Sequence, residues 1–470
     1  MFELHHLTAQ QQLDWLRRGE VTPRELTEHY LARIERLDPD LGAFVTVTAE
    51  RALERADAVA ETPRVAALWG LPIAEKDLVR RAGVATRFGS RVFSDFVPDD
   101  SDELVTAIDE AGAVSLGKTN TPEFGMPSYT EPVANAPART PYDLSRGAGG
   151  SSGGAAVAVA AGLLPFAPGS DGGGSIRIPA ASTGLVGLKP SRGRIPAGAG
   201  FGDPAGLVVP GPLARTVADA ALMLDALVAA APYRFATAAP TWDGGAFLNA
   251  AVRGEGRFQI GVSTWSPWAT AYELEVAPEA RAALEIATRE LAAIGHGLDE
   301  ITPAEEEGYA PAFRTVWQAG AAGIPVEGDD VDRTEPLTRW LIHRGRQVTA
   351  RELADAMQWL TLFERRLITA FAPFDAVLTP TLAMTPRPLG WYDPDDGERN
   401  FAQQVQYTPF TSMVNVAGLP AITLPVATTD EGLPMGVQLI GRPGGEDVLF
   451  AIGAQLERRL GWHKRHPPQW

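Results

Sequence analysis

Two glycine clusters that carry serine lie close together between positions 145 and 194 of the sequence. The first, GGSSGG, holds Ser151 and Ser152, and the second, DGGGS, ends at Ser175. Glycine has no side chain, so its backbone can approach a ligand closely and present bare N–H groups to a developing negative charge. A serine hydroxyl beside such groups can attack a carbonyl carbon. The pattern therefore predicts hydrolase chemistry.

A serine hydroxyl is a weak nucleophile near neutral pH, so the sequence must also supply a base. None of the histidines lies near the two clusters or has a metal-binding spacing such as HExxH. They are His5, His6, His29, His296, His343, His463 and His466. Only four of the 41 basic residues are lysine, and the rest are arginine. Because a buried lysine can lose its proton and arginine cannot, lysine is the favoured base.

Lys76 is the strongest candidate among the four lysines. It lies in the segment GLPIAEKDL, whose apolar residues predict a buried strand. Lys118 and Lys189 leave two alternatives open. Each has either a role in the site or a structural role, in which it caps a turn or pairs with a carboxylate.

These motifs resemble the signature of the amidase signature family, serine hydrolases that use a Ser–cis-Ser–Lys triad. The resemblance implies that Ser175 is the nucleophile, that Ser151 is a bridging serine after a cis peptide bond at Gly150, and that Lys76 is the base. Lys76 precedes Ser151 by 75 residues, and Ser151 precedes Ser175 by 24, and both spacings are typical of the family. The similarity covers nearly the whole chain through GKTNTPEFG, NVAGLPAITLPV and GLPMGVQLIGRPGGEDVL. It looks closest to the branch with 6-aminohexanoate cyclic dimer hydrolase and bacterial aryl acylamidases.

The resemblance also implies a mechanism. Neutral Lys76 accepts a proton from Ser151, Ser151 accepts the proton of Ser175, and Ser175 attacks the carbonyl carbon. Water then cleaves the acyl-enzyme by the same relay. The implied oxyanion hole consists of the backbone N–H groups of Gly172, Gly173, Gly174 and Ser175. Position 172 often carries a side chain in the family, and glycine there leaves the donors in place but can alter the rigidity of the hole.

Four neighbours are expected to support the site. Asp171 and Arg177 flank the nucleophile and should brace its turn. Ser152 should cap the helix that begins there, since serine is favoured at that position. Ser170 should help to hold the turn.

Other interpretations of the clusters fit less well. Residues 149–153 satisfy the nucleophile-elbow pattern G-x-S-x-G, in which Ser151 would be the nucleophile. That motif needs a strand directly before it, whereas the upstream segment NAPARTPYDLSRGAG reads as a loop. No G-K-[ST] follows either cluster, which disfavours a phosphate-binding loop. A structural glycine turn explains one cluster, but it poorly explains both together with Lys76.

Composition narrows the classes of partner. The net charge of −17 argues against binding to nucleic acid or to an anionic membrane. The absence of cysteine excludes disulfides and thiolate metal sites and fits a reducing compartment. The start, MFELHHLTAQ, lacks signal-peptide features, and the longest apolar run, 155–167, is too short to span a bilayer. We therefore expect a cytoplasmic protein with no nucleic-acid or membrane partner and with no metal or organic cofactor.

The order of the predicted elements indicates an α/β fold with a central mixed β-sheet and helices on both faces. We expect one domain over residues 1–470, with a helical segment at 1–62, a signature core at 63–215 and a pocket-covering region at 300–345. No secondary-structure pattern is clear in that last region. The helical segment should pack on the core or on a second subunit, which leaves a homodimer open. Helices are predicted at 7–20, 22–37, 49–60, 102–112, 152–162, 217–229, 278–294, 350–371 and 446–460.

The sequence thus predicts an amidohydrolase that cleaves carbon–nitrogen bonds other than peptide bonds in a small-molecule amide. Ile178 and the apolar flank of Ser175 indicate a largely non-ionic substrate, such as an aryl amide, a nylon-type oligomer or a carbamate (urethane). By resemblance, Gly125 and Met126 line the acyl pocket. The alternatives are the A subunit of a glutamine-dependent tRNA amidotransferase, a non-catalytic binding protein and a histidine-dependent hydrolase.

Overall fold

The N-terminal segment forms helices, as predicted, and one of them begins with a capping box. The computed structural model describes residues 3–195, 203–229 and 245–470, and the part of the signature core at 196–202 lies outside them. The hydroxyl of Thr22 accepts the N–H of Glu25, and the Glu25 carboxylate accepts the N–H of Thr22. This capping box satisfies two otherwise unpaired N–H groups. The elements are η1 (Leu4–His6), α1 (Ala9–Arg18), α2 (Pro23–Leu41) and α3 (Ala49–Ala60).

A small sheet joins this segment to the site. It contains β1 (Phe44–Val47), β3 (Val114–Thr119) and β2 (Pro72–Lys76) in that order, with α4 (Glu103–Glu110) between β2 and β3 in the sequence. β2 and β3 are parallel, and β1 is antiparallel to β3. The sequence predicts one central sheet, whereas β1, β2 and β3 form a sheet separate from that of the later strands.

The large sheet has eight strands and is mixed, as predicted. Neighbouring strands are antiparallel from β4 to β9, and β9, β7 and β8 are parallel. In spatial order the strands are β4 (Phe166–Asp171), β6 (Val209–Ala214), β5 (Val186–Lys189), β10 (Ala421–Thr428), β11 (Pro434–Gly441), β9 (Ala376–Pro380), β7 (Gln259–Val262) and β8 (Gly297–Glu300).

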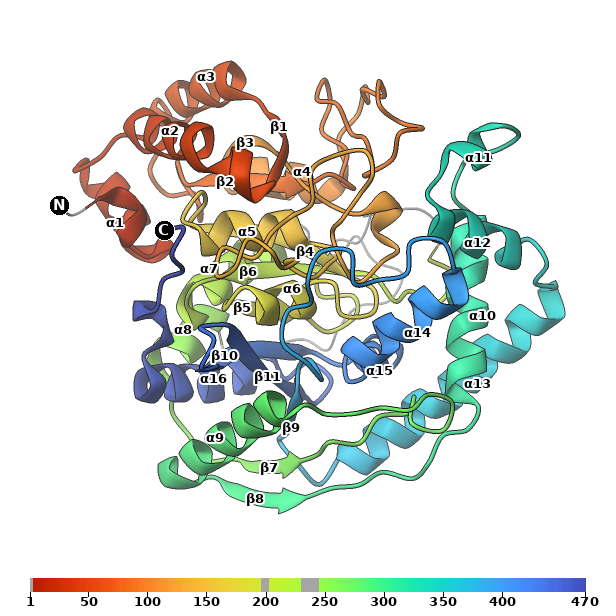
Figure 1. Ribbon diagram of the computed structural model, residues 1–470. Helices are drawn as coiled ribbons and strands as arrows, with labels where there is room; N and C mark the ends of the chain where they lie inside the picture. Colours follow the sequence, from red (N-terminus) through yellow and green to blue (C-terminus); the bar gives the residue numbers. More distant parts are fainter. Residues whose placement is uncertain (1–2, 196–202, 230–244) are drawn as a thin grey trace.

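Helices cover both faces of the large sheet, which confirms the predicted fold class (Figure 1). They are α5 (Gly153–Ala160), α6 (Arg177–Ser182), α7 (Val217–Ala229), α9 (Pro278–Ile294) and α16 (Glu446–Leu460), with α8 (Phe247–Arg253) packed on α7 and α16. Gly187 of β5 pairs with Thr423 of β10, so the two residues face the same side of the sheet. This side is covered by α6, because a Cβ at Gly187 would lie 2.6 Å from Cβ of Ala180. Leu424 faces the other side. There its Cδ2 atom lies 3.4 Å from the Cβ position of Gly453 in α16.

Helices from the C-terminal half form a layer on the side away from the two termini (Figure 1). Residues 300–345, where the sequence shows no clear pattern, contain three of them. The layer consists of α10 (Tyr309–Ala322), α11 (Asp330–Arg333), α12 (Pro336–Gly345), α13 (Ala350–Phe371), α14 (Gly397–Tyr407) and α15 (Ser412–Val416). Two short turns, η2 (Glu123–Gly125) and η3 (Trp462–Lys464), complete the elements. Among the described helices, none combines the length and apolar character needed to cross a bilayer.

Candidate active site

Lys76 ends the buried strand β2 with its amino group at two serines. Its side chain is 1% exposed. The Nζ atom donates to Oγ of Ser151 at 2.7 Å and to Oγ of Ser170 at 3.2 Å. Ser151 lies in the loop before α5, and Ser170 lies in β4. The lysine therefore connects the small sheet with the first strand of the large one.

Burial makes this amine a weaker base than an ordinary lysine. It lowers the pKa of Lys76 from 10.5 to about 7, although the negative charge of Asp171 partly opposes the shift. Removal from water disfavours the charged form of an amine. A large fraction of Lys76 is therefore neutral near pH 7 and able to accept a proton.

The two serine clusters meet beside this lysine. The peptide bond between Gly150 and Ser151 is cis, as the family resemblance implies. The N–H of Ser152 donates to the carbonyl of Ser175 at 3.1 Å. Ser151 and Ser175 line the same pocket. The structure thus brings together the three residues of the implied triad.

Ser152 does not cap α5, contrary to the prediction. Its backbone (φ −89°, ψ 39°) is not the extended conformation that aims a serine hydroxyl at the first turn of a helix. Instead its Oγ atom donates to the carbonyl of Ser170 and accepts the N–H of the same residue, both at 3.2 Å. Ser152 therefore ties the Ser151 loop to β4.

The carboxylate of Asp171 holds the turn that carries Ser175. It accepts the N–H groups of Gly174 at 2.7 Å and of Ile176 at 3.2 Å. The guanidinium of Arg177 adds two hydrogen bonds of 2.9 Å, and both side chains are fully buried. Burial by itself would raise the pKa of Asp171, but the contacts, above all with Arg177, lower it to about 2. Asp171 is therefore ionised throughout the neutral range.

This brace corrects the predicted oxyanion hole at one position. Because the N–H of Gly174 already donates to Asp171, it is not free to bind an oxyanion. The N–H groups of Gly172, Gly173 and Ser175 donate to no partner among the described residues. Gly172 and Gly173 each line a pocket beside Ser175, and Gly174 lines neither pocket. Three of the four candidate donors therefore remain.

Residues from the C-terminal half complete the support of this turn. Asn415 donates to the carbonyl of Asp171 at 2.7 Å and accepts from Arg177 at 2.6 Å. The hydroxyl of Thr411 donates to the carbonyl of Gly173 at 2.6 Å. Sequence analysis assigned no role to these two residues, although Asn415 begins the NVAGLPAITLPV motif that supported the resemblance.

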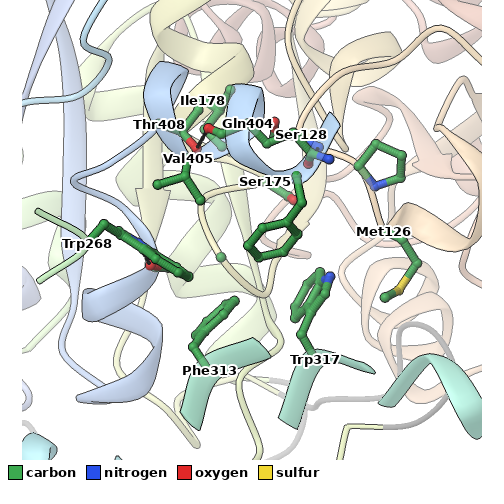
Figure 2. A pocket seen from close by; sticks show the side chains of 14 residues that line it. Met126, Ser128, Ser175, Ile178, Trp268, Phe313, Trp317, Gln404, Val405 and Thr408 are labelled. Atoms are coloured by element: carbon green, nitrogen blue, oxygen red, sulfur yellow. Dashed lines mark hydrogen bonds between the residues drawn. The ribbon is translucent and has the colours of Figure 1, made fainter. Parts of the chain in front are cut away.

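Ser175 lies where two pockets meet, and Met126 and Trp317 line both of them. The empty space at the two pockets, open solvent included, is about 500 and 590 Å³. The wall of the first pocket contains several aromatic rings, among them Trp268, Phe313 and Trp317 in Figure 2. Phe401, Val405, Gln404 and Thr408 also line it. The second pocket is lined by Ser151, Gly125 and Gly172, and by the apolar side chains of Leu78, Phe124, Leu207, Val208 and Val316.

No basic side chain among the described residues lines either pocket. The lining includes one acidic residue, Asp203, whose carboxylate accepts the N–H groups of Leu207 and Val208 at 2.8 Å. None of the seven histidines lines either of these pockets, which argues against the histidine-dependent alternative. Among the described residues, the lining of the two pockets therefore offers no positively charged side chain.

Met126 lines both pockets and Gly125 lines the second pocket alone, whereas the resemblance implies that both residues line the acyl pocket. Gly125 has φ +69°, and a Cβ there would lie 2.6 Å from Leu78 and 3.3 Å from Oγ of Ser151. Only glycine lets this loop approach Ser151 so closely. Of the two tryptophans in region 300–345, Trp317 lines the site and Trp340 does not.

Lys118 and Lys189 have structural contacts. The Nζ atom of Lys118 lies 3.5 Å from Oδ1 of Asp77 and also donates to the carbonyl of Val79. Lys189 donates to the carbonyl of Pro190 at 2.8 Å. Neither lysine lines either of the two pockets. The structural alternative therefore fits both residues.

Most residues of the pocket wall carry no signal that would have predicted them from the sequence. Trp268, Phe313 and Phe401 come from segments that match no catalytic motif. One signal was present, because Tyr309, Phe313, Val316 and Gly320 follow the spacing of a buried helix face and are buried in α10. That spacing could have revealed the helix, but not the pocket that it faces.

Comparisons with known proteins agree with this arrangement. The family model described as Amidase matches residues 25–450. Putative amidase AmiB2 of Mycobacterium tuberculosis is 39% identical over 461 residues, which cover 96% of this chain and 95% of that protein. The A subunit of the glutamyl-tRNA(Gln) amidotransferase of Moorella thermoacetica is 35% identical over 495 residues, which cover 99% of each.

Solved structures are similar over nearly the full length. The structure of 6-aminohexanoate cyclic dimer hydrolase complexed with substrate has a TM-score of 0.90 and 31% identity and covers 99% of this chain and 100% of that one. The structure of a bacterial aryl acylamidase has a TM-score of 0.84 and 26% identity, with coverage of 98% and 97%.

Proposed function

This chain belongs to the amidase signature family and is a hydrolase of amide carbon–nitrogen bonds, and from this premise we propose that it cleaves small, non-ionic amides through an acyl-enzyme on Ser175. One observation carries the proposal. The buried amine of Lys76 lies 2.7 Å from the hydroxyl of Ser151, which lines the same pocket as Ser175.

The proposed chemistry passes protons along a relay from Ser175 through Ser151 to Lys76. Neutral Lys76 accepts the proton of Ser151 while Ser151 accepts that of Ser175, and Oγ of Ser175 attacks the carbonyl carbon. When the tetrahedral intermediate collapses, Ser151 donates a proton to the leaving nitrogen and regains one from Lys76. Water then attacks the acyl-enzyme by the same relay and releases the acid.

The oxyanion is held by backbone donors in this proposal. The N–H groups of Gly172, Gly173 and Ser175 are the candidates, and the Asp171 carboxylate keeps their turn in place. Such preorganised donors are effective because they need no rearrangement as charge develops. Loss of one typically costs about 3 kcal/mol in the transition state.

The pocket walls support a non-ionic substrate. Aromatic rings in the first pocket suit a flat or apolar group, and the described lining offers no cation to bind a carboxylate. Aryl amides and nylon-type oligomers meet this requirement. Carbamates (urethanes) present the same carbonyl to the same nucleophile, so they belong to the proposed range.

The A subunit of a glutamine-dependent amidotransferase is the second candidate, because such a protein is 35% identical to this chain. Glutamine carries a carboxylate and an ammonium group, and both lose their hydration when they are bound. A buried charge needs a partner. No basic side chain in the described pocket lining supplies one for the carboxylate, so this candidate is disfavoured.

A substrate panel tests the proposal. Purified enzyme is assayed with anilides, linear and cyclic nylon oligomers, aliphatic amides, carbamates and glutamine. We expect turnover of non-ionic amides, an acyl adduct on Ser175 by mass spectrometry, and neither in Ser175→Ala. Ser145→Ala, at an exposed serine, is the matched control and should keep both. Turnover of glutamine alone would favour the second candidate.

A further inference from the structure

The two pockets at Ser175 differ in their access to Ser151. Ser175 lines both pockets, whereas Ser151 lines the second and not the first. A substrate held at Ser175 with its amide bond at the nucleophile has two parts, one on each side of that bond. The position of Ser151 therefore distinguishes the two sides.

Chemistry links one of these parts to Ser151. The amine cannot leave as an anion, so its nitrogen must receive a proton as the carbon–nitrogen bond breaks. A proton donor must lie within hydrogen-bond distance of that nitrogen. Resting on the proposed function, in which Ser151 is this donor, we infer that the second pocket binds the amine portion and the first pocket binds the acyl portion, with Trp317 as the specificity-determining wall between them.

Trp317 has the position that this role requires. Its ring stacks on Phe313 of the first pocket, with centroids 5.7 Å apart and planes at 17°. Two of its ring carbons lie 3.5 Å from the Cβ position of Gly172, which lines the second pocket. Figure 2 shows the Trp317 ring beside Phe313 and near Ser175. The indole therefore lies between Phe313 of the first pocket and Gly172 of the second.

Glycine at position 172 makes room for this wall. A Cβ there would lie 3.1 Å from Val208 and 3.5 Å from the Trp317 ring. The first of these contacts is tighter than ordinary van der Waals packing, so a Cβ at 172 would push Val208 by a few tenths of an ångström, whereas its contact with the indole would be ordinary. The glycine and the tryptophan thus act as a pair that shapes the second pocket.

The assignment predicts the preferred substrates. The acyl portion meets the aromatic rings of Trp268, Phe313 and Phe401, which favour a flat aromatic group. The amine portion meets mainly Leu78, Leu207, Val208 and Val316, which favour a compact apolar group. Amides of aromatic acids with small apolar amines are therefore the expected class.

Two valines allow a matched test. Val405 lines the first pocket only, and Val208 lines the second only. One series of anilides has acetyl, benzoyl and naphthoyl groups, and one series of benzamides has ammonia, aniline and naphthylamine as the amine. Val405→Ala should raise kcat/KM for naphthoyl relative to acetyl about threefold or more and leave the amine series unchanged. Val208→Ala should raise kcat/KM for the naphthylamine benzamide relative to the ammonia benzamide and leave the acyl series unchanged. Trp317→Ala should change the kcat/KM ratios in both series.

Deacylation gives a second readout, because only the acyl group remains on Ser175 after the amine has left. The single-turnover deacylation rate should change in Val405→Ala and match wild type in Val208→Ala. Exchanged effects of the two valines, or equal effects on both series, would overturn the inference while the proposed function stands. If the wild-type enzyme neither turns over these amides nor forms an acyl adduct, both fail.

Discussion

The amino group of Lys76 donates to the hydroxyl of Ser170 at 3.2 Å, in addition to its shorter contact with Ser151. Ser170 is a residue of β4, the first strand of the large sheet, and its side chain is buried. This second hydroxyl orients the amine without contact to the reacting atoms in the proposed mechanism. Ser170 is therefore a positioning residue for the base.

Replacement of Ser170 tests this role. Ser170→Ala removes one hydrogen bond, which is worth about 0.5–1.5 kcal/mol, so kcat should fall about 3- to 10-fold. Ser170→Thr keeps the hydroxyl and should restore the rate. A merely structural role would not move the pH–rate profile, whereas loss of a partner of the amine should shift its midpoint. An unchanged kcat and midpoint in Ser170→Ala would contradict the role.

The rate should depend on pH through Lys76. Burial lowers the pKa of this lysine to about 7, so the amine is protonated and inactive as a base below that pH and neutral above it. We expect kcat/KM to rise as pH increases from 5 to 8 and then to level off. The measurement uses an amide that does not ionise in this range. A flat profile would rule out an amine that loses its proton in this range.

The chemistry of the base also predicts the effect of arginine at this position. Lys76→Arg keeps a positive charge that cannot be lost, so it should be as damaging as Lys76→Met, with a fall in kcat on the order of 10³-fold or more. Lys464→Arg, at an exposed lysine, is the matched control and should keep wild-type kinetics. Near-normal turnover by Lys76→Arg would remove lysine from the relay.

The brace beneath Ser175 predicts a stability effect. Asp171 and Arg177 form a fully buried ion pair, so Asp171→Asn leaves the guanidinium without its counter-charge. Loss of one partner of a buried pair costs about 3–5 kcal/mol. We expect the free energy of unfolding in urea to fall by this amount. Asp355→Asn breaks an exposed pair with Arg351 and should leave stability nearly unchanged, and equal effects of the two variants would refute the brace.

Local signals predicted many of the elements well. Thr22 with Glu25, and Thr349 with Glu352, form capping boxes at the starts of α2 and α13, two of the predicted helices. Such boxes involve residues three positions apart, so a short stretch of sequence contains all of their interactions. The pairing of β2 with β3 in a separate sheet was not predicted, because strand partners depend on contacts between distant segments.

In the site, too, some features followed from local sequence and others depended on contacts in the folded chain. Residue types pointed to two serine-bearing glycine clusters and to a lysine base, because the chemistry needs a hydroxyl and a base and the chain has few lysines. The resemblance to the amidase signature family then selected Lys76, Ser151 and Ser175. The resemblance also suggested a backbone oxyanion hole, but it could not show that Asp171 takes the N–H of Gly174. That N–H is occupied because the turn places the carboxylate of Asp171 within hydrogen-bond distance of Gly174.

The sequence, through its motifs and their resemblance to the amidase signature family, thus supplied the candidate reacting groups, because their chemistry belongs to the side chains and to the glycines beside them. Tertiary structure decided how those groups behave. It buries Lys76 and so lowers its pKa to about 7, and it places Trp317 of α10 against Gly172 to divide the pockets. Both effects come from segments far apart in the chain, because desolvation and pocket shape arise only when such segments pack together.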